Sequence, residues 1–209
     1  SNLIMVEVLS HIVEFRNGES GMHVLNIRSI TKMLLAQLCR ISDQYSAIQP
    51  RIPLIANASA LHDIGKISIS ESILNKPGKL TPEEWLIMKT HSEAGANILE
   101  STRYYPHEEL VSVARDICRW HHERYDGKGY PDGLVGDDIP IEAQVVALAD
   151  VYDALTSDRC YKKACPHEQA VEMILNGECG AFNPMLLECF VEIKDDLKRE
   201  LEEERRNKA

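Results

Sequence analysis

The stretch MHVLNIRSITKMLLAQLCRI, residues 22–41, shows a spacing of apolar residues that recurs through much of the chain. Within it Ile27, Ile30 and Leu34 stand three or four positions apart, with mostly polar residues between them. This spacing places the apolar side chains on one face of an α-helix and the polar ones on the other. The segment is therefore predicted to be an amphipathic helix.

Similar periodicity recurs on both sides of this segment. Residues 3–16 carry Ile4, Val8 and Ile12 in one apolar stripe of a second amphipathic helix. Further helices are predicted at 51–64, 82–100, 108–121, 141–155, 166–175 and from 183 to near the end. No segment alternates like a strand, and the clusters of glycine and proline interrupt helices instead of linking hairpins. The predicted fold class is all-α, a bundle of about seven to nine helices.

The composition and net charge of the chain limit the classes of function that it can have. With 209 residues, 44% of them apolar and 27% charged, the chain is expected to form one ordinary globular domain. Its net charge of -10 argues against a nucleic-acid polymer as ligand, because such binding needs cations placed against phosphates, but it leaves room for a small anion met by metal ions. No apolar run could span a bilayer and no signal segment is visible, so we expect a cytoplasmic protein without membrane contact. The six cysteines contain no Cys-x-x-Cys pair and are expected to be reduced.

Three parts of the chain differ in character. Residues 1–16 are predicted to be a helix that links to an absent upstream domain, because Ser1-Asn2 resembles a remnant of an expression tag. Residues 17–193 hold the potential functional residues. Residues 194–209 carry six basic and six acidic residues on a helix whose apolar stripe is Ile193, Leu197 and Leu201. A solvated terminal helix is predicted there, and a helix that forms a homodimer or connects domains is the alternative.

The segment Leu61-His62-Asp63-Ile64-Gly65-Lys66 places an imidazole beside a carboxylate at the end of a small, apolar helix. Burying a carboxylate without a partner is costly, so Asp63 needs a compensating cation. A carboxylate that bridges two metal ions meets this need, and Lys66 then lies where its ammonium can reach a phosphate at the metals. Gly65 is expected to end this helix. The alternative interpretation of the segment is a helix C-cap with surface charges.

Four other positions add potential ligands from separate helices. Glu19 and His23 are four residues apart and therefore project from one helical face. Asp150 lies inside an apolar helix and requires a buried arginine or a metal. His91 and the pair His121-His122 have ordinary structural interpretations when taken alone. The combined set of five imidazoles and three carboxylates is Glu19, His23, His62, Asp63, His91, His121, His122 and Asp150.

This donor set indicates the kind of metal. Sites rich in nitrogen with several carboxylates suit Fe, Mn, Co, Ni or Zn better than Mg or Ca, which prefer shells of oxygen. At about four to six ligands per ion, these residues are enough for two ions, and for three if water completes the shells. We expect two or three divalent transition-metal ions, with Fe or Mn preferred and Zn, Ni or Co as alternatives.

Ordered motifs over most of the chain resemble one known family. His62-Asp63 is similar to the signature of HD-domain phosphohydrolases. His121-His122-Glu123 followed by Asp126-Gly127-Lys128-Gly129-Tyr130-Pro131 resembles the extended motif of the HD-GYP subfamily. The resemblance runs from about residue 19 to residue 190 and includes the stretches 74–81, 150–155, 158–162 and 182–184. It implies an all-helical HD-domain bundle and a phosphodiesterase of bacterial signalling, which opens cyclic di-GMP to pGpG or, after a second cleavage, to GMP.

The resemblance also implies individual roles. The metal ligands would be the set given above, with Glu19 as the extra carboxylate of members that hold three metals. Arg159 and Lys162 match positions that contact phosphate, and Lys66 matches the lysine near the scissile phosphate. The expected mechanism has Asp63 bridging two ions, a metal-activated hydroxide attacking phosphorus in line, and Lys66 stabilising the phosphoryl oxygens or the leaving oxygen.

The loop that contains Tyr130 has a separate expected task. Gly127 and Gly129 allow backbone conformations that other residues resist, so the loop can present Tyr130 to a ribose or a guanine. A surface turn with a packed aromatic ring is the alternative.

Two other functions stay open. The first keeps the site and changes the substrate to another nucleotide or to cyclic GMP-AMP, because the loop does not separate guanine from adenine. The second is a sensor or scaffold that binds the dinucleotide without cutting it, or that docks a partner such as a GGDEF-domain cyclase. Retention of every matched ligand favours the enzyme.

Overall fold

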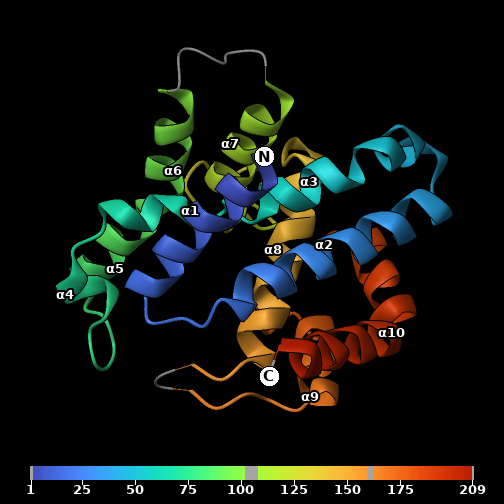
Figure 1. Cartoon of the computed structure of the whole chain (residues 1–209). Helices are drawn as coiled ribbons and strands as arrows, with labels where there is room; N and C mark the ends of the chain where they lie inside the picture. Colours follow the sequence, from blue (N-terminus) through green and yellow to red (C-terminus); the bar gives the residue numbers. More distant parts are fainter. Residues whose placement is uncertain (1, 102–107, 160–161, 209) are drawn as a thin grey trace.

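The computed structural model describes residues 2–101, 108–159 and 162–208 (Figure 1). Within these ranges it contains nine α-helices of eight residues or more, one helical turn of four residues, and no β-strand. The helices are α1 (Asn2–Arg16), α2 (Met22–Ile41), α3 (Ile52–Ser59), α4 (Glu71–Leu74), α5 (Pro82–Lys89), α6 (His91–Glu100), α7 (Glu109–Trp120), α8 (Ile141–Thr156), α9 (His167–Leu175) and α10 (Pro184–Lys208). Short 3-10 segments lie at Asp43–Arg51, Ile64–Ser68 and Gly136–Asp138. The predicted all-α class is confirmed.

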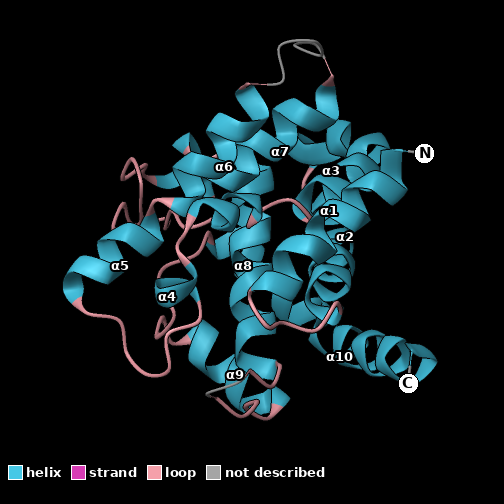
Figure 2. Ribbon diagram, turned by 60° about the vertical axis from the view of Figure 1, so that its left-hand side comes forward, coloured by secondary structure: helices cyan, strands magenta, loops and turns pink. Residues whose placement is uncertain are grey.

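Helices α2 and α8 form the centre of the bundle. The apolar stripe predicted on α2 is buried, with Ile27, Ile30 and Leu34 fully inaccessible to solvent. Helix α2 packs against α3, α8 and α10, while α7 packs against α3, α6 and α8. In both views the pair α6 and α7 lies at one end of α8, and α9 and α10 lie at the other (Figures 1 and 2). The ends of several helices are thereby brought to one place beside the middle of α8.

Two predicted helices are shorter in the structure than in the sequence-based prediction. Residues 51–64 were expected to be one helix, but α3 ends at Ser59 and the chain turns into the 3-10 segment that begins at Ile64. Residues 82–100 were expected to be one helix, but it breaks at Thr90 into α5 and α6. Gly65 lies inside the 3-10 segment and does not end a helix, so that expectation is wrong as well.

The apolar stripe predicted on α1 does not face the core, so this prediction is also wrong. Ile4, Val8 and Ile12 are 64%, 46% and 55% exposed, whereas Val6 and Val13 are buried on the opposite side of the helix. Apolar residues lie on most sides of α1, so their spacing does not show which side of the helix faces the core. A polar contact helps to fix that side: buried Ser10 donates a hydrogen bond from Oγ to the carbonyl of Ala60 at 2.8 Å.

The C-terminal helix is part of the bundle. Helix α10 runs through residue 194 without a break, and its stripe Ile193, Leu197 and Leu201 is buried. It packs against α2 and α9. The prediction of a solvated terminal helix is therefore wrong for this face.

Two further expectations, on membrane-spanning segments and on cysteines, can be compared with the described residues. Among them no helix combines the length and the apolar character needed to cross a membrane. The five described cysteines, Cys39, Cys118, Cys165, Cys179 and Cys189, are free thiols. Cys160 lies outside the described residues.

We predict that Leu197→Ala destabilises the protein by about 2–5 kcal/mol, because a fully buried leucine is replaced by a cavity. Val191→Ala is the matched control: Val191 lies on the same helix but is 40% exposed, and its loss should cost less than about 1 kcal/mol. The free energy of unfolding, measured in denaturant, checks both. Equal small effects would mean that the end of α10 does not pack on α2 in solution.

Candidate metal centre

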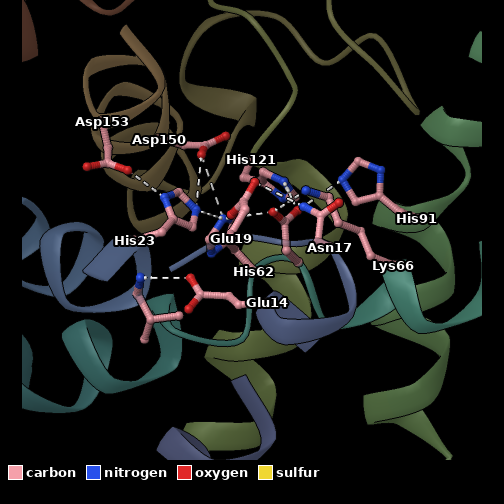
Figure 3. A network of polar contacts seen from close by, with 12 residues as sticks. Glu14, Asn17, Glu19, His23, His62, Lys66, His91, His121, Asp150 and Asp153 are labelled. Atoms are coloured by element: carbon pink, nitrogen blue, oxygen red, sulfur yellow. Dashed lines mark hydrogen bonds and ion pairs between the residues drawn. The ribbon is translucent and has the colours of Figure 1, made fainter. Parts of the chain in front are cut away.

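The residues proposed as ligands come from five places in the chain and meet beside α8. Figure 3 labels six of them: Glu19, His23, His62, His91, His121 and Asp150. His23 is in the first turn of α2, and Asp150 is in the middle of α8. The remaining ligands follow or begin helices: His62-Asp63 come after α3, His91 opens α6, and His121-His122 come directly after α7. The structure thus brings together all the histidines and aspartates that the sequence singled out.

Hydrogen bonds fix the orientation of four of the five imidazoles. In each of the four rings Nδ1 lies within hydrogen-bond distance of an oxygen that only accepts, so Nδ1 carries the hydrogen and Nε2 is left as the potential ligand atom. The contacts are His23 to Asp153 Oδ2 at 2.6 Å, His62 to Ser59 O at 2.8 Å, His91 to Met88 O at 2.7 Å and His121 to Cys118 O at 3.0 Å.

The Nε2 atoms face one another across the site. Those of His23 and His62 are 3.4 Å apart, and those of His91 and His122 are 3.2 Å apart. Two lone pairs at such distances repel unless a proton or a metal cation lies between them. Nε2 of His121 is buried and has no hydrogen-bond partner. A buried acceptor without a donor is costly, so this donor set fits divalent metal ions.

The ligand atoms form two groups. One comprises Asp63, His91, His121 and His122, and the other comprises His23, His62 and Asp150; within each group the atoms lie within 4.8 Å of one another. The carboxylate of Asp63 lies between them: Oδ1 is 3.3 Å from Nε2 of His91, and Oδ2 is 3.3 Å from Nε2 of His62. Asp63 would therefore be available to both groups of ligands if they hold metal ions.

Gly65 allows the turn that carries Asp63 to approach α6. A β-carbon at this position would stand 1.8 Å from the carbonyl oxygen of His91 and 2.5 Å from the amide nitrogen of Gly95. No side chain fits into that space, so glycine lets the 3-10 segment pack directly on α6. This contact brings Asp63 to His91.

A third group contains a carboxylate that the sequence reasoning missed. Glu14, Glu19 and His23 have ligand atoms within 4.8 Å of one another. Oε1 of Glu14 accepts the amide hydrogen of Val24 at 2.9 Å, while Oε2 is buried without a hydrogen-bond partner. Burial raises the pKa of Glu14 to about 7. Its only sequence signal was a charge inside an apolar helix, in a segment that we had interpreted as a linker.

Glu19 already has partners in this structure. Its Oε1 accepts a hydrogen bond from Nδ2 of Asn17 at 3.0 Å and lies 3.3 Å from a guanidinium nitrogen of Arg159. A third ion at this place would therefore compete with Arg159 for the carboxylate.

The pKa shifts of the metal-free site follow from burial and from Asp63. Burial lowers the pKa of His62, but the neighbouring Asp63 carboxylate outweighs it and raises that pKa from 6.5 to about 9. Burial lowers the pKa of His121 and, together with the neighbouring His121, that of His122. Burial would raise the pKa of Asp63, yet Lys66 and His62 hold it well below its usual value. The carboxylate of Asp63 is therefore ionised beside a protonated His62. Two further groups shift in the same directions. Burial lowers the pKa of His23, but its hydrogen bond to Asp153 outweighs burial and raises that pKa. Burial would raise the pKa of Asp150, but His62 holds it below its usual value.

Asp153 acts through His23. Besides contacting His23 through Oδ2, this buried carboxylate accepts from Nδ2 of Asn26 at 2.7 Å and from Oγ of Ser157 at 2.9 Å through Oδ1. Carboxylates of this kind set the ring orientation and the basicity of ligand histidines. These contacts support a role for Asp153 in bracing the site.

The loop after α7 is held by Glu123, which the sequence reasoning gave no role. The buried carboxylate accepts three backbone hydrogen bonds, from the amides of Asp132, Gly133 and Leu134 at 2.7, 3.1 and 3.0 Å. These partners lie nine to eleven residues further along the chain. They fold the loop back on the end of α7.

The same loop places Tyr130 against a candidate ligand. Its ring stacks on that of His122, with centroids 4.8 Å apart and planes inclined by 15°. Gly127 has a positive φ of 79°, as expected, whereas Gly129 is needed because a β-carbon there would stand 2.4 Å from the carbonyl oxygen of His122. The packed-aromatic alternative describes this position of Tyr130.

A cleft of about 780 Å³ opens from the site towards solvent. Its lining residues include Glu19, His23, Lys66 and Arg159. Nζ of Lys66 lies 2.8 Å from Oδ2 of Asp63, so its ammonium stands between the cleft and the bridging carboxylate. Lys162 is exposed and pairs through its backbone with Arg159 at 2.9 and 3.1 Å. Lys162 and Tyr130 are not among the lining residues.

Comparisons with known proteins identify the family of the chain. A family model described as "HD domain" matches residues 15–183. The chain belongs to the HD domain family. This HD domain is 41% identical over 190 residues to a "Probable cyclic di-GMP phosphodiesterase" of Vibrio cholerae, covering 90% of the chain and 43% of that relative. It is 40% identical over 193 residues to a "3'3'-cGAMP-specific phosphodiesterase 2" of the same species, covering 92% of the chain and 35% of that relative.

The solved structure of "Bd1817, a HDG"Y"P protein from Bdellovibrio bacteriovorus" resembles this HD domain with a TM-score of 0.57 and 22% identity, over 82% of the chain and 51% of that protein. This likeness shows the fold. The chain spans about two fifths of the length of the two curated relatives.

We predict that Asp153→Asn weakens metal binding by about 10- to 100-fold, because the ring of His23 loses its charged partner. The dissociation constant, measured by competition with a chelator, checks this. Asp195→Asn is the control, because that carboxylate is exposed and pairs only with Lys194 among the described residues. An unchanged dissociation constant for Asp153→Asn would contradict a role in orienting His23.

Metal binding should depend on pH through His62. Because its pKa is about 9 without metal, the ring is protonated at pH 7.5 and must release its proton to become a ligand. We expect His62 to contribute about one released proton near pH 7.5, and binding to tighten as pH rises towards 9, with no further gain from His62 above it. Calorimetry in two buffers of different ionisation enthalpy measures the proton release.

The same shift predicts the stability of the metal-free protein. Stability from charged His62 is complete below pH 6.5, its unperturbed pKa, and is lost as pH rises through about 9. The Tm of chelator-treated protein should fall over that range. A flat profile, or binding without proton release, would show that His62 is neutral at pH 7.5.

Proposed function

We propose that this HD domain is a metal-dependent phosphodiesterase that hydrolyses cyclic di-GMP to pGpG, GMP or both. The observation that carries the proposal is the position of Asp63: it lies between two imidazole-rich groups and beside Lys66, which lines a cleft that opens to solvent. The names of the Vibrio cholerae relatives support the reaction class.

The site is proposed to hold two ions, with Asp63 shared between the groups, and a third where Glu14 and Glu19 meet His23. A divalent transition metal is proposed because the donors are mostly imidazoles with a few carboxylates. Fe or Mn is preferred from the resemblance to the HD-GYP subfamily, and Zn, Ni or Co are the alternatives. Divalent ions held there supply Lewis acidity to a phosphoryl oxygen and lower the pKa of water towards about 7.

Asp63 and Lys66 are the proposed catalytic residues. The low pKa of Asp63 keeps its carboxylate ionised, so it can serve both groups of ligands at neutral pH. Burial lowers the pKa of Lys66, but Asp63 outweighs it and the pKa is raised, so the side chain remains an ammonium. An ammonium there can donate a hydrogen bond to a phosphoryl oxygen, or a proton to the leaving oxygen.

Arg159 and Lys162 are proposed to position the second phosphate. The guanidinium of Arg159 is on the wall of the cleft, 3.3 Å from Glu19. The backbone of Arg159 pairs with that of Lys162, so the two cationic residues are neighbours in space. A phosphate attracts a guanidinium through paired hydrogen bonds, so it can draw Arg159 from Glu19. Tyr130 is proposed to contact a ribose or guanine of the substrate, with its ring stacked on that of His122.

The cleft supports a substrate as large as a cyclic dinucleotide. Its volume of about 780 Å³ lies within the range of about 300–1000 Å³ that is usual for small-molecule sites. Cyclic GMP-AMP is a second candidate, favoured by the relative named for it. A sensor or scaffold that does not cut is less favoured, because all the candidate ligands meet in one site. A cytoplasmic location, a homodimer, an upstream sensory domain and a GGDEF-domain partner are proposed from the sequence alone.

We predict that Asp63→Asn lowers turnover by about 1000-fold, because loss of the shared ligand removes about 4 kcal/mol of Lewis-acid stabilisation. Metal content by mass spectrometry should fall with it. Asp116→Asn, on α7 and paired with Arg115, is the control that should keep both. Full metal content and turnover in Asp63→Asn would contradict the proposal.

The substrate is tested with wild-type protein loaded with Fe or Mn. Cyclic di-GMP, cyclic GMP-AMP and linear pGpG are incubated separately and the products are resolved by chromatography. Cleavage of cyclic di-GMP with the highest kcat/KM supports the proposal, and preference for cyclic GMP-AMP supports the second candidate. Tight binding without cleavage of any of them would support the sensor.

A further inference from the structure

The ring of Tyr130 already has two neighbours. It stacks on the ring of His122, and the ammonium of Lys89 lies 5.2 Å from the centre of the Tyr130 ring. Tyr130 does not line the cleft, but Phe15 does. Phe15 is therefore the aromatic side chain available on the wall that leads to the metal centre.

Phe15 is exposed to an unusual degree for its type. Its side chain is 87% accessible, more than any other large apolar side chain recorded as exposed among the described residues. A single exposed apolar residue is ordinary by itself. Here it borders the same cleft as Lys66 and Arg159, and Met88 and Leu74 also line that cleft. The cleft thus has apolar surface as well as cations.

The backbone beside Phe15 is tied to the catalytic segment. The guanidinium of Arg16 donates to the carbonyl of Lys66 at 2.8 Å and to that of Ile69 at 2.6 Å. Nδ2 of Asn75 donates to the carbonyl of Arg16 at 2.9 Å. These bonds hold the end of α1 against the turn that carries Lys66, so the backbone of Phe15 is fixed relative to the place proposed for the scissile phosphate.

We propose that Phe15 is a stacking platform for one purine base of the substrate. The inference rests on the proposed function, because it needs a nucleotide whose phosphate lies at Lys66. An aromatic ring on a fixed backbone gives up few rotatable bonds when a base covers it. Every purine has a π-face, so this contact contributes affinity for the dinucleotide without separating guanine from adenine.

A different use of the ring has to be excluded. Phe15 belongs to an exposed apolar side of α1 that also carries Ile4, Val8 and Ile12. That side could serve contact with another protein chain instead of a base. Ile12 is 55% exposed, three residues from Phe15, and does not line the cleft, so Ile12→Ala is the matched control.

The test compares wild-type protein with Phe15→Ala, Phe15→Trp and Ile12→Ala, all loaded with the same metal. Stacking lost on alanine substitution corresponds to a rise in KM for cyclic di-GMP of about 5- to 100-fold. We expect this rise for Phe15→Ala with kcat and metal content unchanged, and a similar rise with cyclic GMP-AMP. Phe15→Trp and Ile12→Ala should remain within about threefold of wild type.

Three results would overturn the inference. They are a KM for Phe15→Ala within twofold of wild type, an equal rise for Phe15→Trp, and an equal rise for Ile12→Ala with a change in molecular mass by light scattering. If wild-type protein cleaves neither dinucleotide, the proposed function fails, and the same variants are compared by the dissociation constant for cyclic di-GMP. Absence of binding by wild-type protein would then overturn the inference too.

Discussion

The hydrogen bond between a histidine Nδ1 and the carbonyl oxygen three residues earlier is the interaction on which the site depends. It occurs at His62, His91 and His121, each time with a carbonyl from the last turn of the preceding helix or just after it. The last carbonyls of a helix have no partner within it, so they are free to accept from a ring that follows. The same local hydrogen bond therefore orients three Nε2 atoms, those of His91 and His121 in one group of ligands and that of His62 in the other. The remaining structure has to bring the three helix ends together.

This requirement explains how far the fold could be predicted from the sequence. Periodicity identified the helices because the buried stripe of α2 repeats clearly, but it extended two of them through the places where they must end. Residues 60–64 and Thr90 are compatible with a helix by their local pattern, and their breaks are set by contacts with distant segments, such as that of Gly65 with His91. Helix α1 could not be oriented because it is apolar almost all round, and the buried stripe of α10 was outweighed by the many charges beside it.

For the site, the sequence supplied the residues whose chemistry is evident from their type and spacing. It did not supply those whose role depends on a distant partner. Glu123 is one carboxylate among many until the amides of residues 132–134 fold onto it, and Glu14 becomes part of the site only because α1 packs beside the first turn of α2. Tyr130 was recognised by its loop, but its stacking on His122 follows from the close approach of Gly129, which the sequence does not reveal.

The ion pair between Lys66 and Asp63 has a consequence for the order of events in the site. Nζ of Lys66 lies 2.8 Å from Oδ2 of Asp63, so the ammonium and a metal ion would share one carboxylate. Two cations on one carboxylate repel each other, so a metal ion held by Asp63 would weaken the hold of this carboxylate on Lys66. The ammonium would then be free to turn to an anion in the cleft that Lys66 lines. Metal binding and phosphate binding would in this way favour each other.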